Sequence, residues 1–298
     1  MKGPVNAHVH LELPAVPTVA GAGFLPWVRS WIHDRPASRA HAFANAREVA
    51  GFGTGGVVDI GNLGVGAAAM AAAGLDGLAF HEVFGFDDPN VADGVADATP
   101  HAPYSTHAET VRRIAARGGP WSMHVDEDPA ERELLLHGTG PWLDALRAYG
   151  RNLDAWRPPG LTPVRWLDRL GVLGPHALLV HCTLTGKDDL ELLAERDVSV
   201  CICPRSNLHI GGRLPDVRTM LDVGCRVLLG TDSLASAPDL DVRNEVTVLR
   251  EVFADVPVSR WERALEGDAW AWLARSREAR RTLPDRDAGS RRIAPEGP

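Results

Sequence analysis

The sequence contains very little lysine. Of its 31 basic residues only Lys2 and Lys187 are lysines, and the 39 acidic residues give a formal net charge of −8. Binding to nucleic acid relies on clustered positive charge, and no basic patch dominates this chain. We therefore expect a protein with no nucleic-acid partner.

Long apolar runs are also missing. No apolar stretch approaches the ~18 residues that a transmembrane helix needs, and the first residues lack the apolar core of a secretion signal. We therefore expect a cytoplasmic protein with no membrane partner. A chain of 298 residues, 45% of them hydrophobic, suits one large α/β domain.

Paired cysteine motifs and the common dinucleotide-binding motif are absent. The four cysteines include no Cys-x-x-Cys pair, which gives no indication of a cysteine-based structural zinc site. They lie in apolar runs and are interpreted as buried, reduced thiols. No G-x-G-x-x-G follows the first apolar run, so the sequence gives no indication of a dinucleotide-binding domain, which is the commonest function of an open doubly wound sheet.

Strand-like runs alternate with helical patterns along most of the chain. Strands are expected near residues 5–11, 56–60, 77–84, 94–99, 121–126, 177–182, 198–203 and 226–230. Eight apolar strands separated by amphipathic or alanine-rich segments predict an α/β fold, a (β/α)8 TIM barrel, with catalytic residues at the carboxyl ends of the strands. An open doubly wound sheet is the structural alternative.

Several segments depart from this regular pattern. Residues 85–93 are too short and too rich in turn residues for a helix, so the third crossover is expected to be reduced to a loop. Residues 128–176 form a long insertion within a barrel expected to span 1–275. The polar residues 276–298 are expected to form a disordered tail.

Ionisable residues gather at the predicted strand ends. They are His8 and His10 on one side of the first strand, His124 and then Glu127 after the fifth, His181 at the sixth and Asp232 after the eighth. Each has an ordinary alternative, such as a buried histidine or, for Asp232, a helix N-cap. Because the carboxyl ends of barrel strands share one mouth, the combination favours a metal site.

The motifs HVH, HVDE, VHCT, CPRSN and LGTDS together resemble the amidohydrolase superfamily. Within it the sequence is similar to the mononuclear branch of cytosine, guanine and S-adenosylhomocysteine deaminases. Aminodeoxyfutalosine deaminases and triazine hydrolases are similar as well. The segment TPHAPYS resembles the substrate-side histidine loop of this branch, and the resemblance spans about residues 5–255.

This resemblance implies a role for each matching residue. It implies that one divalent metal per chain, Zn²⁺ or alternatively Fe²⁺, is held by His8, His10, His124 and Asp232. It also implies that His181 bonds the attacking water or the substrate and that Glu127 moves protons together with Asp232. His101 is implied to contact the substrate. The catalytic residues are thus expected to be Glu127, His181 and Asp232. In the two-metal relatives a carboxylated lysine lies on the fourth strand, and neither Lys2 nor Lys187 is placed there.

Three further residues are candidates for substrate contact. They are Glu82 at the end of the third strand, and Arg205 and Asn207 in CPRSN. Arg205 and Asn207 have the equal alternative of fixing their loop by local hydrogen bonds. Asp126 and Asp128, on either side of Glu127, are expected to be solvated loop acids.

These features predict a hydrolase that deaminates an amino-substituted N-heterocycle and releases ammonia. The resemblance favours an adenine-bearing nucleoside or a compound like aminodeoxyfutalosine as its small-molecule substrate. One alternative is hydrolysis of another C–N or C–Cl bond, in a cyclic amide or a triazine, and another is a degenerate barrel that only binds a ligand. Relatives carry a flanking β-sandwich that we expect to be missing here, and the flank bared by the reduced crossover suggests a homodimer.

Overall fold

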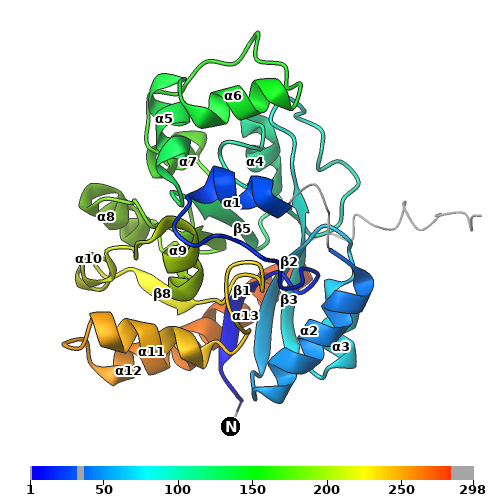
Figure 1. Ribbon diagram of the computed structural model, residues 1–298, viewed down its shortest axis with the longest axis vertical. Coiled ribbons are helices and arrows are strands. Elements are labelled where there is room, and N and C mark those ends of the chain that lie inside the picture. The colour runs from blue at the N-terminus through cyan, green and yellow to red at the C-terminus, as the bar shows by residue number, and fades with distance from the viewer. Residues whose placement is uncertain (1, 32–36, 283–298) are drawn as a thin grey trace, which may run out of the picture.

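The computed structural model describes residues 2–31 and 37–282, and eight parallel strands form its centre (Figure 1). The strands are β1 (Val5–Val9), β2 (Gly56–Gly61), β3 (Asp76–Val83), β4 (Ala98–Pro100), β5 (Trp121–Val125), β6 (Ala177–His181), β7 (Ser199–Ile202) and β8 (Arg226–Leu229). They pair in chain order as two sheets, β1 to β4 and β5 to β8, and every pairing is parallel.

Hydrogen bonds join the two sheets at both seams. At one seam Val9 bridges Asp232, and the Asp232 N–H donates to the His8 carbonyl at 3.1 Å. At the other, the His124 N–H donates to the His101 carbonyl at 2.9 Å, and the Thr99 hydroxyl donates to the Ser122 carbonyl at 2.6 Å. The predicted TIM barrel is confirmed, and the carboxyl ends of its strands share one mouth.

Helices follow most strands, as the periodicity predicts. They are α1 (Phe24–Trp31), α2 (Arg39–Gly51), α3 (Gly66–Ala72), α4 (Ala108–Ala115), α5 (Pro129–His137), α6 (Pro141–Ala148), α7 (Pro163–Leu170), α8 (Lys187–Glu195), α9 (Pro204–Gly211), α10 (Val217–Asp222), α11 (Arg243–Val252), α12 (Val258–Glu262), the π-helix η2 (Arg263–Gly267) and α13 (Asp268–Thr282). Between β3 and β4 the chain forms turns and one isolated bridge, from Gly85 to Thr106, but no helix, so the reduced third crossover is confirmed.

Helix α13 packs against buried strand residues and continues past residue 275, where we expected a disordered tail to begin. Trp272 and Leu273 lie in one apolar cluster with residues of β1, β2 and β6. Ser276 is fully buried within this helix, which corrects the expected boundary. The rest of the expected tail, 283–298, lies outside the described residues.

The mouth of the barrel is partly covered by α1 together with α5 and α6 from the insertion. Phe24 and Trp27 of α1 pack in one apolar cluster with Leu134 of α5 and Trp142 of α6. Figure 1 shows α1, in dark blue, beside these green helices. The Trp27 indole N–H donates to the Ala235 carbonyl at 3.1 Å, which fixes α1 to the loop after β8. This cover shields the strand ends from water.

Two features are missing from the part of the chain that the structure describes. Every strand there belongs to the barrel, so residues 2–31 and 37–282 contain no flanking β-sandwich. Among the same residues, no helix combines the length and the apolar character needed to span a bilayer.

Candidate metal centre and active site

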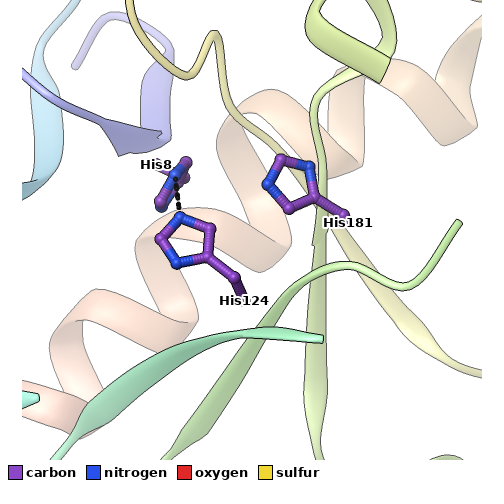
Figure 2. Close-up of side chains that lie close together, drawn as sticks. All are labelled: His8, His124 and His181. Atoms are coloured by element: carbon purple, nitrogen blue, oxygen red, sulfur yellow. Dashed lines mark hydrogen bonds between the residues drawn. The ribbon is translucent and has the colours of Figure 1, made fainter. Parts of the chain in front are cut away.

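The structure brings the four predicted metal ligands together at the mouth of the barrel. The Nε2 atoms of His8 and His124 lie 3.2 Å apart. Asp232 Oδ1 lies 3.7 Å from His8 Nε2 and 3.4 Å from His10 Nε2. In Figure 2 the rings of His8 and His124 approach each other from different strands, with His181 beside them.

This donor set fits one divalent metal ion. Ligand atoms about 2.1 Å from a tetrahedral zinc lie about 3.4 Å from one another. The three measured separations, 3.2 to 3.7 Å, match that spacing. Burial lowers the pKa of His8 to about 4, which keeps its ring neutral and able to bind a metal at pH 7. Imidazoles and a carboxylate are ligands that suit divalent zinc or iron.

The other nitrogen of His124 meets two hydrogen-bond acceptors. His124 Nδ1 lies 3.1 Å from the His101 carbonyl oxygen and 3.3 Å from Glu82 Oε1. Burial would raise the pKa of Glu82, but the nearby charges of His101 and His124 and the hydrogen bond to His124 lower it to about 2. Such acceptors hold the ring hydrogen on Nδ1 and leave the Nε2 lone pair for a metal.

Asp232 uses its two oxygens differently. Oδ1 faces the histidines, whereas Oδ2 accepts hydrogen bonds from Ser206 Oγ at 2.6 Å and Ser236 Oγ at 3.0 Å. These hydroxyls fix the orientation of the carboxylate. Sequence reasoning missed both serines, although Ser206 lies within the motif CPRSN and Ser236 follows closely after LGTDS.

Glu127 lines the same pocket and lies closest to His181 among the site histidines. Its Oε1 atom is 3.6 Å from His181 Nε2, and its side chain is buried. Burial raises the pKa of Glu127 to about 8. A carboxyl group with a pKa near neutrality can both take up and release protons at working pH.

Strained backbone at the strand ends aims these side chains. Asp126, His181, Cys182 and Asp232 all have positive φ angles, 57°, 71°, 48° and 62°. Residues other than glycine rarely adopt this region, and each instance costs about 1–3 kcal/mol. Hydrogen bonds between neighbouring strand ends, such as Cys182 N–H to the Val125 carbonyl at 2.9 Å, hold the conformation. Such strain is typical of functional sites.

The expectation that Asp126 and Asp128 are solvated is wrong. Asp126 is fully buried and accepts two hydrogen bonds from Arg132, at 2.6 and 2.7 Å. Asp128 caps α5 through the Ala130 N–H at 2.8 Å and also accepts from the Phe24 N–H at 3.0 Å. Glu127 therefore lies between two fixed neighbours, which restrict its position.

Arg205 does not contact the pocket, so the expectation of a substrate contact is corrected. Its guanidinium donates to Glu245 Oε1 at 2.6 Å and to Asp239 Oδ1 at 2.8 Å. Both partners lie after β8, and the pairing anchors the start of α9. The alternative of a loop-fixing role agrees with this placement.

Asn207 lies behind the pocket wall rather than in it. Its side-chain nitrogen is 3.0 Å from His181 Nδ1 and 3.1 Å from Thr183 Oγ1, and its side chain is buried. The predicted substrate contact is corrected here too, because Asn207 reaches the site only through His181.

A cavity of about 660 Å³ opens above the donor cluster. Its lining includes His10, Glu82, Phe84, His101, Tyr104, His124, Glu127, Trp142, Tyr149, His181 and Asp232, with Phe24, Trp27 and Trp31 from α1. His101 is held by Ser105 Oγ at 2.6 Å and packs against Phe84. The pocket is therefore polar at its base and aromatic along its walls, and its size is typical of a small-molecule site.

Comparison with known proteins identifies the family. Residues 2–260 match the amidohydrolase family, and the chain belongs to it. The chain is 34% identical over 285 residues to aminodeoxyfutalosine deaminase of Deinococcus radiodurans. The matched region covers 84% of this chain and 67% of that protein. The resemblance found in the motifs is confirmed.

Other relatives match over shorter regions. A 5'-deoxyadenosine deaminase of Methanothermobacter thermautotrophicus is 30% identical, over 54% of this chain and 34% of its own length. A 5-methylthioadenosine/S-adenosylhomocysteine deaminase of Syntrophobacter fumaroxidans is 36% identical, over 49% of this chain and 30% of its own. The chain thus spans about a third of the length of these two relatives.

Solved structures confirm the fold. Aminofutalosine deaminase of Helicobacter pylori, in complex with methylthio-coformycin, has a TM-score of 0.76 at 18% identity and covers 92% of this chain and 74% of its own. An adenosine deaminase of Xanthomonas campestris with bound zinc has a TM-score of 0.69 at 22% identity and covers 93% of this chain and 67% of its own.

Proposed function

We propose that this protein is a metal-dependent hydrolase that deaminates adenine-bearing nucleosides. The observation that carries the proposal is the approach of Glu127 to His181, at 3.6 Å, beside the cluster of His8, His10, His124 and Asp232. The relatives from D. radiodurans, M. thermautotrophicus and S. fumaroxidans are deaminases, two of them named for adenosine derivatives, and they support this substrate class.

The four-residue cluster would hold one divalent ion, for which we propose zinc. When bound, zinc supplies Lewis acidity and can lower the pKa of water to about 7. The bound zinc of the X. campestris neighbour supports this choice over iron. The chain has no lysine on β4 to hold a second ion, which supports a single metal per chain.

Glu127 would carry the protons of the reaction. Its carboxylate takes a proton from the water that attacks the ring carbon bearing the amino group. The carboxylic acid so formed gives this proton to the ring nitrogen next to that carbon. The proton left on the added hydroxyl group then passes to the amino group, the C–N bond breaks, and ammonia leaves as the ring carbon becomes a carbonyl. Asp232, with Oδ2 held by Ser206 and Ser236, shares the proton transfer through Oδ1.

The walls of the pocket suit a flat heterocycle. Phe84 and Tyr104 flank His101, with ring centroids 4.3 and 5.6 Å from that of the imidazole. Aromatic side chains pack well on planar rings, and His101 and Glu82 can offer hydrogen bonds from the base of the pocket. We propose that these two residues contact the substrate ring.

The activity should fall as the pH is lowered below about 8. Glu127 acts as a base only when ionised, and its pKa of about 8 means that the carboxylate becomes scarce below that value. The logarithm of kcat/KM should then decline with a slope of about one per pH unit. A steady-state pH profile measures this, and a flat rate from pH 8 to pH 5 contradicts the role of Glu127 as base.

Removal of the metal should abolish turnover reversibly. Prolonged dialysis against a chelator at neutral pH should leave protein that releases no ammonia from an adenine nucleoside that the untreated protein deaminates. Titration with zinc should restore activity and reach its limit near one equivalent per chain, as plasma mass spectrometry can verify. Restoration that requires two equivalents contradicts the single-metal site.

We also propose a cytoplasmic homodimer. All four cysteines are free and buried, which agrees with a reducing compartment. Turns replace the third crossover helix on one flank of the barrel, and a second copy can cover this flank. Light scattering on a sizing column should give twice the chain mass at micromolar concentration, and a clean monomer contradicts the dimer.

A further inference from the structure

Two histidines at the mouth of the barrel have opposite partners at Nδ1. The Nδ1 atom of His124 faces a carbonyl oxygen and a carboxylate, both of which only accept hydrogen bonds. The Nδ1 atom of His181 instead faces the side-chain amide of Asn207, at 3.0 Å. The partner of one ring nitrogen decides which nitrogen carries the hydrogen, so the two rings need not be in the same tautomer.

The other side of His181 settles how the Asn207 amide is oriented. His181 Nε2 lies 3.6 Å from Glu127 Oε1, and in the ionised form in which Glu127 acts as a base its carboxylate can only accept. A neutral imidazole has one hydrogen, and facing this carboxylate it belongs on Nε2. His181 Nδ1 is then an acceptor, and Asn207 must present its NH₂ group, which also donates to Thr183 Oγ1 at 3.1 Å.

The opposite orientation is disfavoured at both ends of the ring. With the amide oxygen toward His181, the hydrogen would move to Nδ1, and the Nε2 lone pair would face the carboxylate of Glu127. Two acceptors would then oppose each other in a site where both side chains are buried. The orientation with NH₂ toward His181 leaves only Asn207 Oδ1 without a partner.

We propose that Asn207 is a positioning residue that fixes His181 in the tautomer with hydrogen on Nε2. A nitrogen that carries hydrogen cannot bind a metal, so His181 stays outside the ligand set and keeps an N–H to donate to the reacting oxygen atom. This control is needed because one ring nitrogen from each of His8, His124 and His181 lies within 4.8 Å of the other two. The catalytic part of the inference rests on the proposed function, whereas the tautomer does not.

Helix α9 holds Asn207 in place. The Asn207 N–H donates to the Cys203 carbonyl at 2.8 Å, and the adjacent Ser206 bonds Asp232. Arg205 ties the same turn to Glu245 and Asp239. Three consecutive residues thus connect the start of one helix to the ends of two barrel strands, which explains how Asn207 keeps a fixed distance from His181.

The decisive variant is Asn207→Asp, which changes the amide to an acceptor of the same size. The carboxylate should draw the hydrogen to Nδ1 of His181, as Glu82 and His101 do for His124. The freed Nε2 should then join the metal ligands. We expect the ¹⁵N spectrum to show the hydrogen of His181 on Nδ1 instead of Nε2. Zinc retention against a chelator should rise about tenfold or more. The value of kcat should fall about 100-fold with little change in KM.

Two controls separate this effect from a general defect. Asn207→Leu removes the amide without offering an acceptor, so it should lower kcat without raising zinc retention. Asn45→Asp makes the same chemical change at another buried asparagine, whose amide donates to the Leu11 and Leu13 carbonyls, and should leave the His181 signals unchanged.

The wild-type protein provides a further test that needs no variant to fold. Its ¹⁵N spectrum, recorded at a pH at which Glu127 is ionised, should show hydrogen on Nε2 of His181, and hydrogen on Nδ1 overturns the proposal. Unchanged His181 signals and unchanged zinc retention in folded Asn207→Asp protein overturn it as well. If the signals exchange but wild-type protein deaminates no adenine nucleoside, the tautomer assignment holds and the proposed function fails.

Discussion

Replacing Glu127 by glutamine lowers kcat about 10⁴-fold in the proposed mechanism. An amide cannot take the proton of the attacking water or pass it to the substrate, and proton transfer by a positioned side chain contributes about 10²–10⁴-fold. The largest value applies because one residue serves both steps. The rate of ammonia release from 5'-deoxyadenosine measures the loss, and zinc content should stay near that of wild-type protein.

A matched control is available on the adjacent helix. Glu133 of α5 is outside the pocket, and its side chain accepts from the Thr139 hydroxyl near the surface. Glu133→Gln should therefore keep the wild-type rate. If Glu127→Gln with a full complement of zinc also keeps a near-normal rate, Glu127 is not the proton carrier.

The second large effect is expected for Asp232→Asn. This change keeps the shape but removes the negative charge that faces His8 and His10 and disturbs the two serine hydrogen bonds to Oδ2. Loss of one partner in proton transfer should lower kcat by at least about 10³-fold. Zinc retention should fall as well, because the neutral amide is a weaker ligand than a carboxylate. Parallel measurements of kcat and of zinc after chelator challenge test both.

Asp216→Asn is a suitable control for this variant. Asp216 caps α10 through the Thr219 N–H at 3.1 Å and has no contact with the pocket. The substitution should cost little stability, because asparagine is also a good N-cap, and should leave both zinc retention and kcat unchanged. Wild-type zinc retention in Asp232→Asn protein would remove Asp232 from the ligand set.

The convergence of these residues could be predicted from simple periodicities. Strand residues two apart share a side, which pairs His8 with His10, and the carboxyl ends of barrel strands share a mouth, which adds His124, His181 and Asp232. Both rules act through the backbone alone. Which of these residues form the proposed ligand set was implied only by the resemblance to the amidohydrolase superfamily.

The residues after the strands could not be assigned in the same way. Arg205, Ser206 and Asn207 are consecutive, yet the first turn of α9 directs them to Glu245, to Asp232 and to His181. Which of them faces the pocket depends on the direction of that turn, and nothing in CPRSN specifies it. Asp126 was misjudged for a similar reason, since its partner Arg132 lies on the following helix, α5.

The boundary of α13 was missed because its arginines resemble a solvated tail. In the structure Arg275 pairs with Asp197, Arg277 with Asp76 and Arg280 with Asp97. Each of these three aspartates lies at the start of a strand or in the turn just before one. These partners are distant in sequence. Composition alone therefore gave a polar segment where the fold has a docked helix.

The most direct test of the proposed function is ammonia release by the zinc-loaded protein. The panel comprises adenosine, 5'-deoxyadenosine, 5-methylthioadenosine, S-adenosylhomocysteine and aminodeoxyfutalosine, each incubated with protein that carries one zinc per chain. We predict that at least one of them yields one ammonia per molecule converted, and that chelated protein yields none. If protein with its zinc in place releases no ammonia from any of the five, the assignment as an adenine nucleoside deaminase is contradicted.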